Sequence, residues 1–388
     1  MYASLVRPET LSPGDLDLFL ERGWFRLGNG LFTTSFLTFE ETLFDAFWLR
    51  INLSDFRASR SQKEILKKTA AFRVVTGKAL LTGEKEALFH KYRESVSFQP
   101  ARHLEAILPQ EDTIFDSKEV CIYDGDRLVA CGFFDLGEAG AEGIVSFFDP
   151  DYKRFSLGKA LVLNKIFYCK ERGLKWFYPG YVVPGYSRFD YKLDIARENS
   201  EYYDLSLGEW RDIRELEVKK QPLSRMLTAL IQLEGVLHSF GFENFRLKKY
   251  RFYDIVLDPA YTEYDLLTYP YFVHCFANSS LEEVVIVYDT FATSYKLLLC
   301  HKMFRANRPL AGEEDIYFSE YLLREAKVIF TEKNPFNFVF GLHSILKQSS
   351  NTGTVKKYRK LNMGGNYCRC LKVTTCKALR TREHTKSR

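Results

Sequence analysis

The sequence predicts an α+β fold in which helices pack on a mixed sheet. Three observations lead to this prediction: alternating apolar segments that pair as hairpins, a strand–helix–strand unit in the middle of the chain, and Gly, Pro and Asp residues that separate these elements. The composition is globular, with 46% hydrophobic and 27% charged residues in a chain of 388. A chain of this length can build two or three domains.

The elements follow from periodicity and from start and stop residues. In the first half, the pattern predicts a helix over 10–22, a strand–turn–strand over 22–32, a strand over 47–53, a helix or turn capped by Ser59 or Ser61, and a helix over 79–92. The central segment predicts a hairpin of 120–124 with 128–136, a strand over 143–148, a helix over 156–172 ending at Gly173, and a strand over 176–182.

The segment beyond residue 200 has weaker patterns. A helix over 223–240 ends at Gly241, residues 284–288 and 294–299 form a hairpin, and 315–331 mixes a helical start with an apolar, strand-like end. We therefore expect four regions: a smaller N-terminal α+β domain over 1–115, a catalytic core over 116–200, an unassigned α+β region over 201–345, and a basic tail over 346–388.

The net charge of +5 conceals an asymmetry, because the tail carries twelve Lys and Arg against one Glu. Residues 1–345 therefore have 43 basic and 49 acidic side chains. Such a tail attracts nucleic acid by neutralising phosphates, or it is a solvated terminus without a partner. The sequence leaves both readings open.

Several classes of protein are disfavoured. No run of about 18 apolar residues predicts a membrane span, and the N-terminus has no signal-peptide core, so we expect a cytoplasmic protein. The motifs of common hydrolases, zinc proteases and nucleotide-binding loops are absent. The eight cysteines form no CxxC pair. Cys368, Cys370 and Cys376 could bind a metal, but no fourth ligand is evident, so we predict no metal and no cofactor.

The most informative segment runs from the Asp149-Pro turn to Lys192. In it, the basic loop from Lys153 to Gly158 opens a helix, where free backbone N–H groups attract anions. The loop resembles the acyl-CoA loop of the GNAT fold, with Ser156 in place of the first Gly. The alternative is an ordinary N-cap by the Ser156 hydroxyl.

Two further groups of residues have a functional and a structural reading. Tyr178 and Tyr181 flank a Pro-Gly pair on a strand, which suits a slot for a flat base or a peptide, or simply core packing. A basic cluster on the helix after residue 59 suits phosphate binding, or it is a solvated helix face. Its members are Arg57, Arg60, Lys63, Lys67 and Lys68.

Three blocks together resemble the arginyl-tRNA–protein transferase family, which includes bacterial leucyl relatives. The blocks are Arg-Gly-Trp-Phe-Arg-Leu-Gly-Asn over 22–29, Phe-Arg-Ala-Ser-Arg-Ser-Gln over 56–62, and the segment from Leu128 through Phe-Asp-Pro-Asp-Tyr and Ser-Leu-Gly to Tyr191-Lys192. The resemblance covers about residues 15–200. It implies a GNAT-like catalytic domain that moves an aminoacyl group from charged tRNA, arginine above all, to the N-terminal amine of a protein with an acidic first residue. The product is an N-degron, which marks that protein for degradation.

The resemblance also implies roles for particular residues. The donor-binding set, which would hold the 3′ end and acceptor arm of the tRNA, is Lys153, Arg154, Ser156, Leu157, Gly158, Arg57, Arg60, Lys63 and Lys67. Tyr178 and Tyr181 would line the slot, with Asp149 as a candidate base or a turn residue. Arg188, Tyr191 and Lys192 would bind the acidic acceptor.

The sequence departs from the family at several positions. The family's N-terminal Cys cluster is absent, since residues 33–47 contain no Cys and Ala46 stands near one expected Cys. Pro179, Tyr186 and Phe189 replace an expected Leu, Cys and Met. Two alternatives therefore stay open: an acetyl-CoA-dependent N-acetyltransferase and a non-catalytic homologue that binds RNA or degrons.

Overall fold

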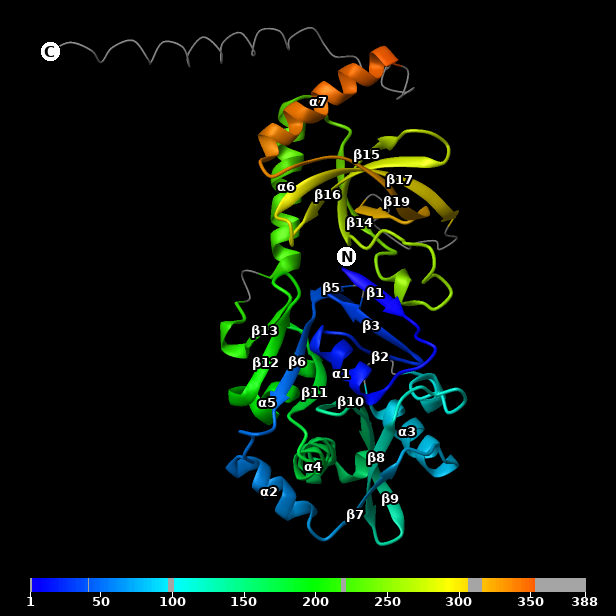
Figure 1. The fold of residues 1–388 in the computed structure, drawn as a ribbon, viewed down its shortest axis with the longest axis vertical. Coiled ribbons are helices and arrows are strands. Elements are labelled where there is room, and N and C mark those ends of the chain that lie inside the picture. Colours follow the sequence, from blue (N-terminus) through cyan, green and yellow to red (C-terminus); the bar gives the residue numbers. More distant parts are fainter. Residues whose placement is uncertain (1, 41, 97–100, 218–220, 306–315, 353–388) are drawn as a thin grey trace, which may run out of the picture. The chain divides into compact units, whose positions relative to one another are not determined.

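The chain forms two compact units, each built around its own sheet (Figure 1). The computed structural model describes residues 2–40, 42–96, 101–217, 221–305 and 316–352. The first unit comprises Met1–Leu227, Phe252–Pro270 and Thr290–Ala292, and the second comprises Thr228–Arg251, Tyr271–Asp289 and the residues from Thr293 onward. The predicted basic tail beyond residue 352, with its three cysteines, lies outside the described residues.

An eight-stranded sheet forms the centre of the first unit, in the order β13-β12-β6-β11-β10-β9-β8-β7. Its strands are β6 (Phe47–Asn52), β7 (Arg73–Lys78), β8 (Ser117–Asp124), β9 (Arg127–Leu136), β10 (Gly140–Phe148), β11 (Trp176–Val182), β12 (Ser200–Asp204) and β13 (Glu209–Asp212). Neighbouring strands are antiparallel except β10 and β11, which are parallel. The predicted α+β fold with a mixed sheet is confirmed.

Smaller elements surround this sheet. Two small sheets precede it, namely β1 (Ala3–Val6), β2 (Phe25–Leu27) and β3 (Gly30–Thr34), and the hairpin of β4 (Phe36–Phe39) and β5 (Thr42–Asp45). The helices are α1 (Pro13–Glu21), α2 (Arg60–Thr69), α3 (Gly83–Ser95), α4 (Leu157–Glu171) and α5 (Tyr191–Ala196). The eight-stranded sheet contains strands that precede residue 115, such as β6 and β7, and strands that begin at residue 200 or later, β12 and β13. The domain boundaries expected near residues 115 and 200 remain predictions.

Strand alternation decides which helix covers which face of the sheet. On β9, Ala130 and Phe134 belong to a core that contains Leu161 and Ile166 of α4. Cys131 and Phe133 point the other way, into a core with Phe89 of α3. The sheet is therefore buried on both faces, with α4 against one of them and α3 against the other.

The second unit contains a six-stranded sheet in the order β18-β14-β15-β16-β17-β19. Its strands are β14 (Arg246–Tyr250), β15 (Tyr271–Ala277), β16 (Glu282–Asp289), β17 (Ser294–Arg305), β18 (Tyr317–Phe318) and β19 (Tyr321–Glu332). Helix α7 (Pro335–Thr352) packs on it through Phe338, whose ring lies 4.5 Å from that of Phe330, and most of α6 (Pro222–Ser239) belongs to this unit. None of the helices in the described residues has the length and apolar content needed to cross a membrane.

A buried ionic network ties β2 to the eight-stranded sheet. Arg26 contacts both oxygens of Asp135 at 3.1 Å, and both side chains are essentially fully buried. Glu142, directly opposite Asp135 on β10, accepts the Arg26 backbone N–H at 2.9 Å. Burial, reinforced by the negative charge of Asp135, raises the pKa of Glu142 to about 8. The Glu142 carboxyl is therefore mostly protonated at neutral pH.

The network predicts that stability falls with pH. Between its unfolded pKa and about 8, Glu142 binds more protons in the folded state than in the unfolded state, so raising the pH lowers the free energy of unfolding. We expect Glu142→Gln, which keeps an oxygen for the Arg26 N–H, to remove a loss of about 3 kcal/mol between pH 5 and 7. Urea unfolding at each pH measures this loss. The exposed Glu171→Gln is the control, and equal pH slopes in both variants would contradict the assignment.

Candidate functional site

The parallel strands β10 and β11 separate after a short paired stretch. They pair only over residues 140–142 and 176–178, although β10 continues to Phe148 and β11 to Val182. Both strands have irregular register just beyond this stretch, at Gly143/Val145 and at Phe177/Gly180. Unpaired backbone groups in the middle of a sheet need other partners. We call residues 143–148 and 179–182 the split.

The N-terminus of α4 lies against the end of β10. A Cβ atom on Gly158 would lie 3.3 Å from the Phe148 ring, so the first helical turn and this ring are in direct contact. The first amides of a helix have no partner within the helix and carry a partial positive charge. This contact therefore places an anion-attracting helix end beside the split.

Ser156 occupies the N-cap position of α4 in a left-handed conformation, with φ 57° and ψ 41°. Its side chain forms no capping hydrogen bond, so the alternative of an ordinary cap by the Ser156 hydroxyl is wrong. Residues other than glycine rarely adopt this conformation, because their Cβ atom clashes with the backbone. Glycine has no Cβ atom and would therefore suit position 156. Leu157 is fully buried beneath the helix start.

The loop before Ser156 is a short 3-10 turn, Pro150–Phe155. Lys153 and Arg154 are exposed on it. Asp149 is almost fully buried, accepts the Asp151 N–H at 3.0 Å and forms ion pairs with Lys91 and Arg127. Burial alone would raise the pKa of Asp149, but the hydrogen bonds from Lys91 and Arg127 and from the Asp151 amide lower it overall. These contacts tie the turn together, and a base role for Asp149 stays a prediction.

The two predicted slot tyrosines pack against the same hydrophobic core but differ in their position on β11. Tyr178 is 1% exposed and packs edge-on against Phe25 of β2 and Trp210 of β13, within a hydrophobic core. Tyr181 lies on the separated part of β11, where its ring is 4.9 Å from that of Phe189. Of the two, Tyr181 is the one beside the split.

A cluster of tyrosines and cations lies across the split from Phe148. It consists of Tyr92, Tyr181, Tyr186, Arg188, Tyr191 and Lys192. The Tyr92 ring of α3 is 5.5 Å from that of Phe148, and its hydroxyl interacts with Arg188. Burial lowers the pKa of Arg188, which is hydrogen-bonded to Tyr186 and interacts with Tyr181. The structure thus brings the three predicted acceptor-binding residues, Arg188, Tyr191 and Lys192, into one cluster.

Helix α2 carries the predicted basic cluster on its solvent face. Arg60, Lys63 and Lys67 are exposed, whereas Gln62 is buried and donates to the Ile195 carbonyl of α5 at 2.5 Å. Arg57, also exposed, donates to the Ser54 and Phe56 carbonyls. The helix is therefore fixed to α5 on one side and presents cations on the other. This arrangement fits both readings that the sequence left open.

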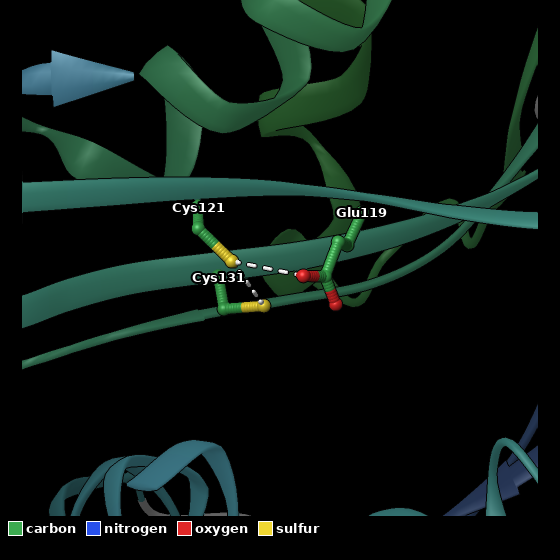
Figure 2. Close-up of side chains that lie close together, drawn as sticks. All are labelled: Glu119, Cys121 and Cys131. Carbon is green, nitrogen blue, oxygen red and sulfur yellow. Dashed lines mark hydrogen bonds between the residues drawn. The ribbon is translucent and has the colours of Figure 1, made fainter. Parts of the chain in front are cut away.

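A group of potential metal ligands that the sequence analysis missed lies on β8 and β9 (Figure 2). The Cys121 sulfur is 3.6 Å from that of Cys131 and 3.7 Å from a Glu119 oxygen. Lys85 donates to both Glu119 oxygens at 2.6 Å, so an ammonium already supplies the positive charge. The hydrogen bond with Cys121, followed by burial, raises the pKa of Cys131. A thiol with a raised pKa at Cys131 and a carboxylate already paired with Lys85 make a structural contact rather than a metal centre.

The comparisons with known proteins decide the family. Residues 84–204 match the family model described as "Arginine-tRNA-protein transferase, C terminus". An aspartate/glutamate leucyltransferase of Leptospira interrogans is 31% identical over 199 residues, which are 48% of this chain and 73% of the relative. The chain belongs to the arginine-tRNA–protein transferase family. It is therefore an aminoacyltransferase.

More distant proteins also match. An aspartate/glutamate leucyltransferase of Campylobacter jejuni is 29% identical over 188 residues, covering 46% of this chain and 75% of the relative. Among solved structures, a tandem GNAT protein from the clavulanic acid biosynthesis pathway matches with a TM-score of 0.30 and 11% identity, over 50% of this chain and 59% of its own. FemX matches with a TM-score of 0.31 and 9% identity, over 48% and 65%. Neither structural match carries an argument about this chain.

The backbone at Ser156 gives a direct test of the helix start. We expect Ser156→Gly to raise the free energy of unfolding by up to about 1 kcal/mol, because glycine relieves the cost of the left-handed conformation. Ser61→Gly, the same change at a helical position of α2, should lower it by up to about 1 kcal/mol. Chemical denaturation measures both. Equal destabilisation by the two changes would contradict the strain at Ser156.

Proposed function

We propose that the protein moves arginine from charged tRNA to the N-terminal amine of proteins that begin with Asp or Glu. One observation carries this proposal: an uncapped helix start, the buried Lys192 and the half-buried Arg188 all lie beside the split between β10 and β11. The description of the family supports arginine, and the names of the relatives support an acidic acceptor, with leucine as the competing donor. Marking such proteins for degradation in the cytoplasm would be the outcome.

The reaction needs positioning more than a strong catalyst. An aminoacyl ester is already activated, and an α-amine with a pKa of about 7.7–8.0 is substantially deprotonated near neutral pH. The Ser156 amide, which was expected to take part, already donates to the Lys153 carbonyl at 3.1 Å. In this proposal the amides of Leu157 and Gly158 bind the anionic 3′ end of the tRNA, with Lys153 and Arg154 beside it. The exposed cations of α2 would then bind the acceptor arm.

Two steps complete the proposed mechanism. Arg188 and Lys192 bind the acidic side chain of the acceptor through charge-assisted hydrogen bonds, while Tyr181 and Tyr191 confine it. The acceptor amine then attacks the ester carbonyl, the bond to the ribose oxygen breaks, and the ribose hydroxyl takes up the proton that the amine loses. The new amide remains on the acceptor.

A transfer assay tests the reaction directly. Purified protein is mixed with each labelled aminoacyl-tRNA of a panel and with peptides that begin with Asp, Glu, Asn or Gln. We expect label from arginyl-tRNA on the Asp and Glu peptides alone, because the cations require a carboxylate. Leucine transfer would replace the donor assignment, and transfer from labelled acetyl-CoA without tRNA would replace the reaction. Binding of tRNA without any transfer would leave a non-catalytic homologue.

The α2 cations allow a second test. Reversing Arg60 and Lys63 to Glu should weaken tRNA binding and reduce the slope of log K against log salt by about 1 for each lost phosphate contact. Filter binding at several salt concentrations measures the slope. Lys78→Glu, a single charge reversal on the exposed edge strand β7, is the control for each of Arg60→Glu and Lys63→Glu made alone. A slope that matches the control would remove α2 from the tRNA-binding surface.

A further inference from the structure

Lys192 is a buried lysine held at a fixed point beside the split. It is 8% exposed, and its amine donates to the Tyr181 carbonyl at 2.9 Å. The same nitrogen lies 4.7 Å from the centre of the Tyr181 ring and 5.0 Å from that of Phe189. A Cβ atom on Gly180 would come within 3.0 Å of it, and the φ of +90° at Gly180 also favours glycine there. The chain has built a pocket for this amine.

A second buried lysine, Lys165, has a full set of hydrogen-bond acceptors, although burial lowers its pKa to about 7 as well. The nitrogen of Lys165 donates to the Phe133 carbonyl at 2.7 Å, the Val145 carbonyl at 3.0 Å and the Ser146 hydroxyl at 3.1 Å. Three acceptors match the three N–H bonds of a charged ammonium. Lys192 has one oxygen acceptor, and no carboxylate among the described residues forms an ion pair with it. A buried cation without a counter-charge is costly.

The charged and titratable groups around Lys192 add to this cost. Arg188, after β11, contributes a like charge, while Tyr181 of β11, Tyr92 of α3 and Tyr191 of α5 are protonated near neutral pH. On its own helix, Asp194 is paired with Lys159 at 3.2 Å. Burial, with Arg188 second, lowers the pKa of Lys192 to about 7. Both geometry and environment therefore favour the neutral amine in the free protein.

We propose that the acidic acceptor binds together with one proton, which Lys192 takes up as the carboxylate supplies the missing counter-charge. This inference rests on the proposed function, because it assigns the acidic residue of the acceptor to the pocket beside Arg188. The balance is simple: a solvent proton adds to the neutral amine, and the resulting ammonium pairs with the bound carboxylate. Acid recognition is thus coupled to pH.

The coupling makes a quantitative prediction for binding in the absence of tRNA. For a peptide that begins with Asp, the Kd should rise about tenfold per pH unit above pH 7, relative to a peptide that begins with Asn. Both peptides have the same α-amine. The ratio of their Kd values is therefore independent of the protonation of that amine. Calorimetry at pH 8 in two buffers of different ionisation enthalpy should count close to one proton taken up with the Asp peptide and none with the Asn peptide.

Lys192→Arg is the test variant, because a guanidinium keeps its charge across this range. It should bind the Asp peptide without proton uptake and without the pH dependence. A wild-type protein that binds the Asp peptide with no proton uptake would overturn the inference, as would a failure to prefer Asp over Asn at any pH.

A measurement on the wild-type protein keeps the inference testable if the Lys192→Arg variant does not fold. The rate of Lys192 modification by fluorodinitrobenzene, followed by mass spectrometry with the exposed Lys153 as reference, should rise with pH and level off just above pH 7. A rate that still climbs above pH 9 would overturn the inference. Proton-coupled binding without any transfer from charged tRNA would instead refute the proposed function and leave the pocket assignment standing.

Discussion

The separation of β10 from β11 is the constraint on which the rest of the site depends. A split in a sheet leaves backbone carbonyls without strand partners, and Lys165 of α4 satisfies part of this need by donating to Val145 on β10. The same lysine also donates to Phe133 on β9, so α4 is fixed to both strands. Because α4 is held there, its first turn meets Phe148 at the end of β10. The hydrogen bonds of a buried lysine thus set the position of the anion-attracting helix end.

Aromatic packing holds the β4–β5 hairpin, which lies in the segment where the resemblance led us to expect a cysteine cluster. The Phe39 ring stacks on that of Tyr186 at 4.6 Å and 2°, and Phe44 lies 5.6 Å from Tyr186. Phe39 also packs against Phe189 at 5.4 Å. Tyr186 and Phe189 are two of the positions at which we expected the sequence to differ from the family, and both pack against this hairpin. Ring contacts between apolar surfaces can fix a hairpin without metal ligands.

Local patterns predicted the elements but not the contacts between them. The hairpin of β8 and β9, helix α4 and strand β11 follow from periodicity and turn residues, and the structure confirms them within a few residues. In the segment predicted over 315–331, residue 315 lies outside the described residues, Ile316 belongs to a 3-10 turn, and β18 and β19 follow from Tyr317, so the strand-like end is confirmed. Apolar pattern alone cannot separate a short helix from a paired strand.

The site shows the same limit. Arg188, Tyr191 and Lys192 are close in sequence, so one segment predicted them together. Tyr92 and Phe148 reach the cluster from α3 and β10, and nothing in their local sequence marks this long-range contact. The conformation of Ser156 was also hidden, because a serine before a helix is the usual sign of a side-chain cap. Its left-handed backbone arises from the 3-10 turn that precedes it.

The cations of α2 differ in burial from Arg188 and Lys192, and this difference gives the two groups different physical roles. Exposed cations such as Arg60 and Lys63 keep their hydration and act over a distance, so they attract any polyanion and lose strength in salt. Lys192 is buried and Arg188 is half-buried, so a carboxylate that reaches them meets less competing solvent than one at the surface of α2. Truncating a desolvated charge pair costs more than removing a rim charge, which is why buried groups discriminate between ligands. On this argument the exposed cations of α2 would govern how often tRNA binds. Arg188 and Lys192 would govern which acceptor is modified.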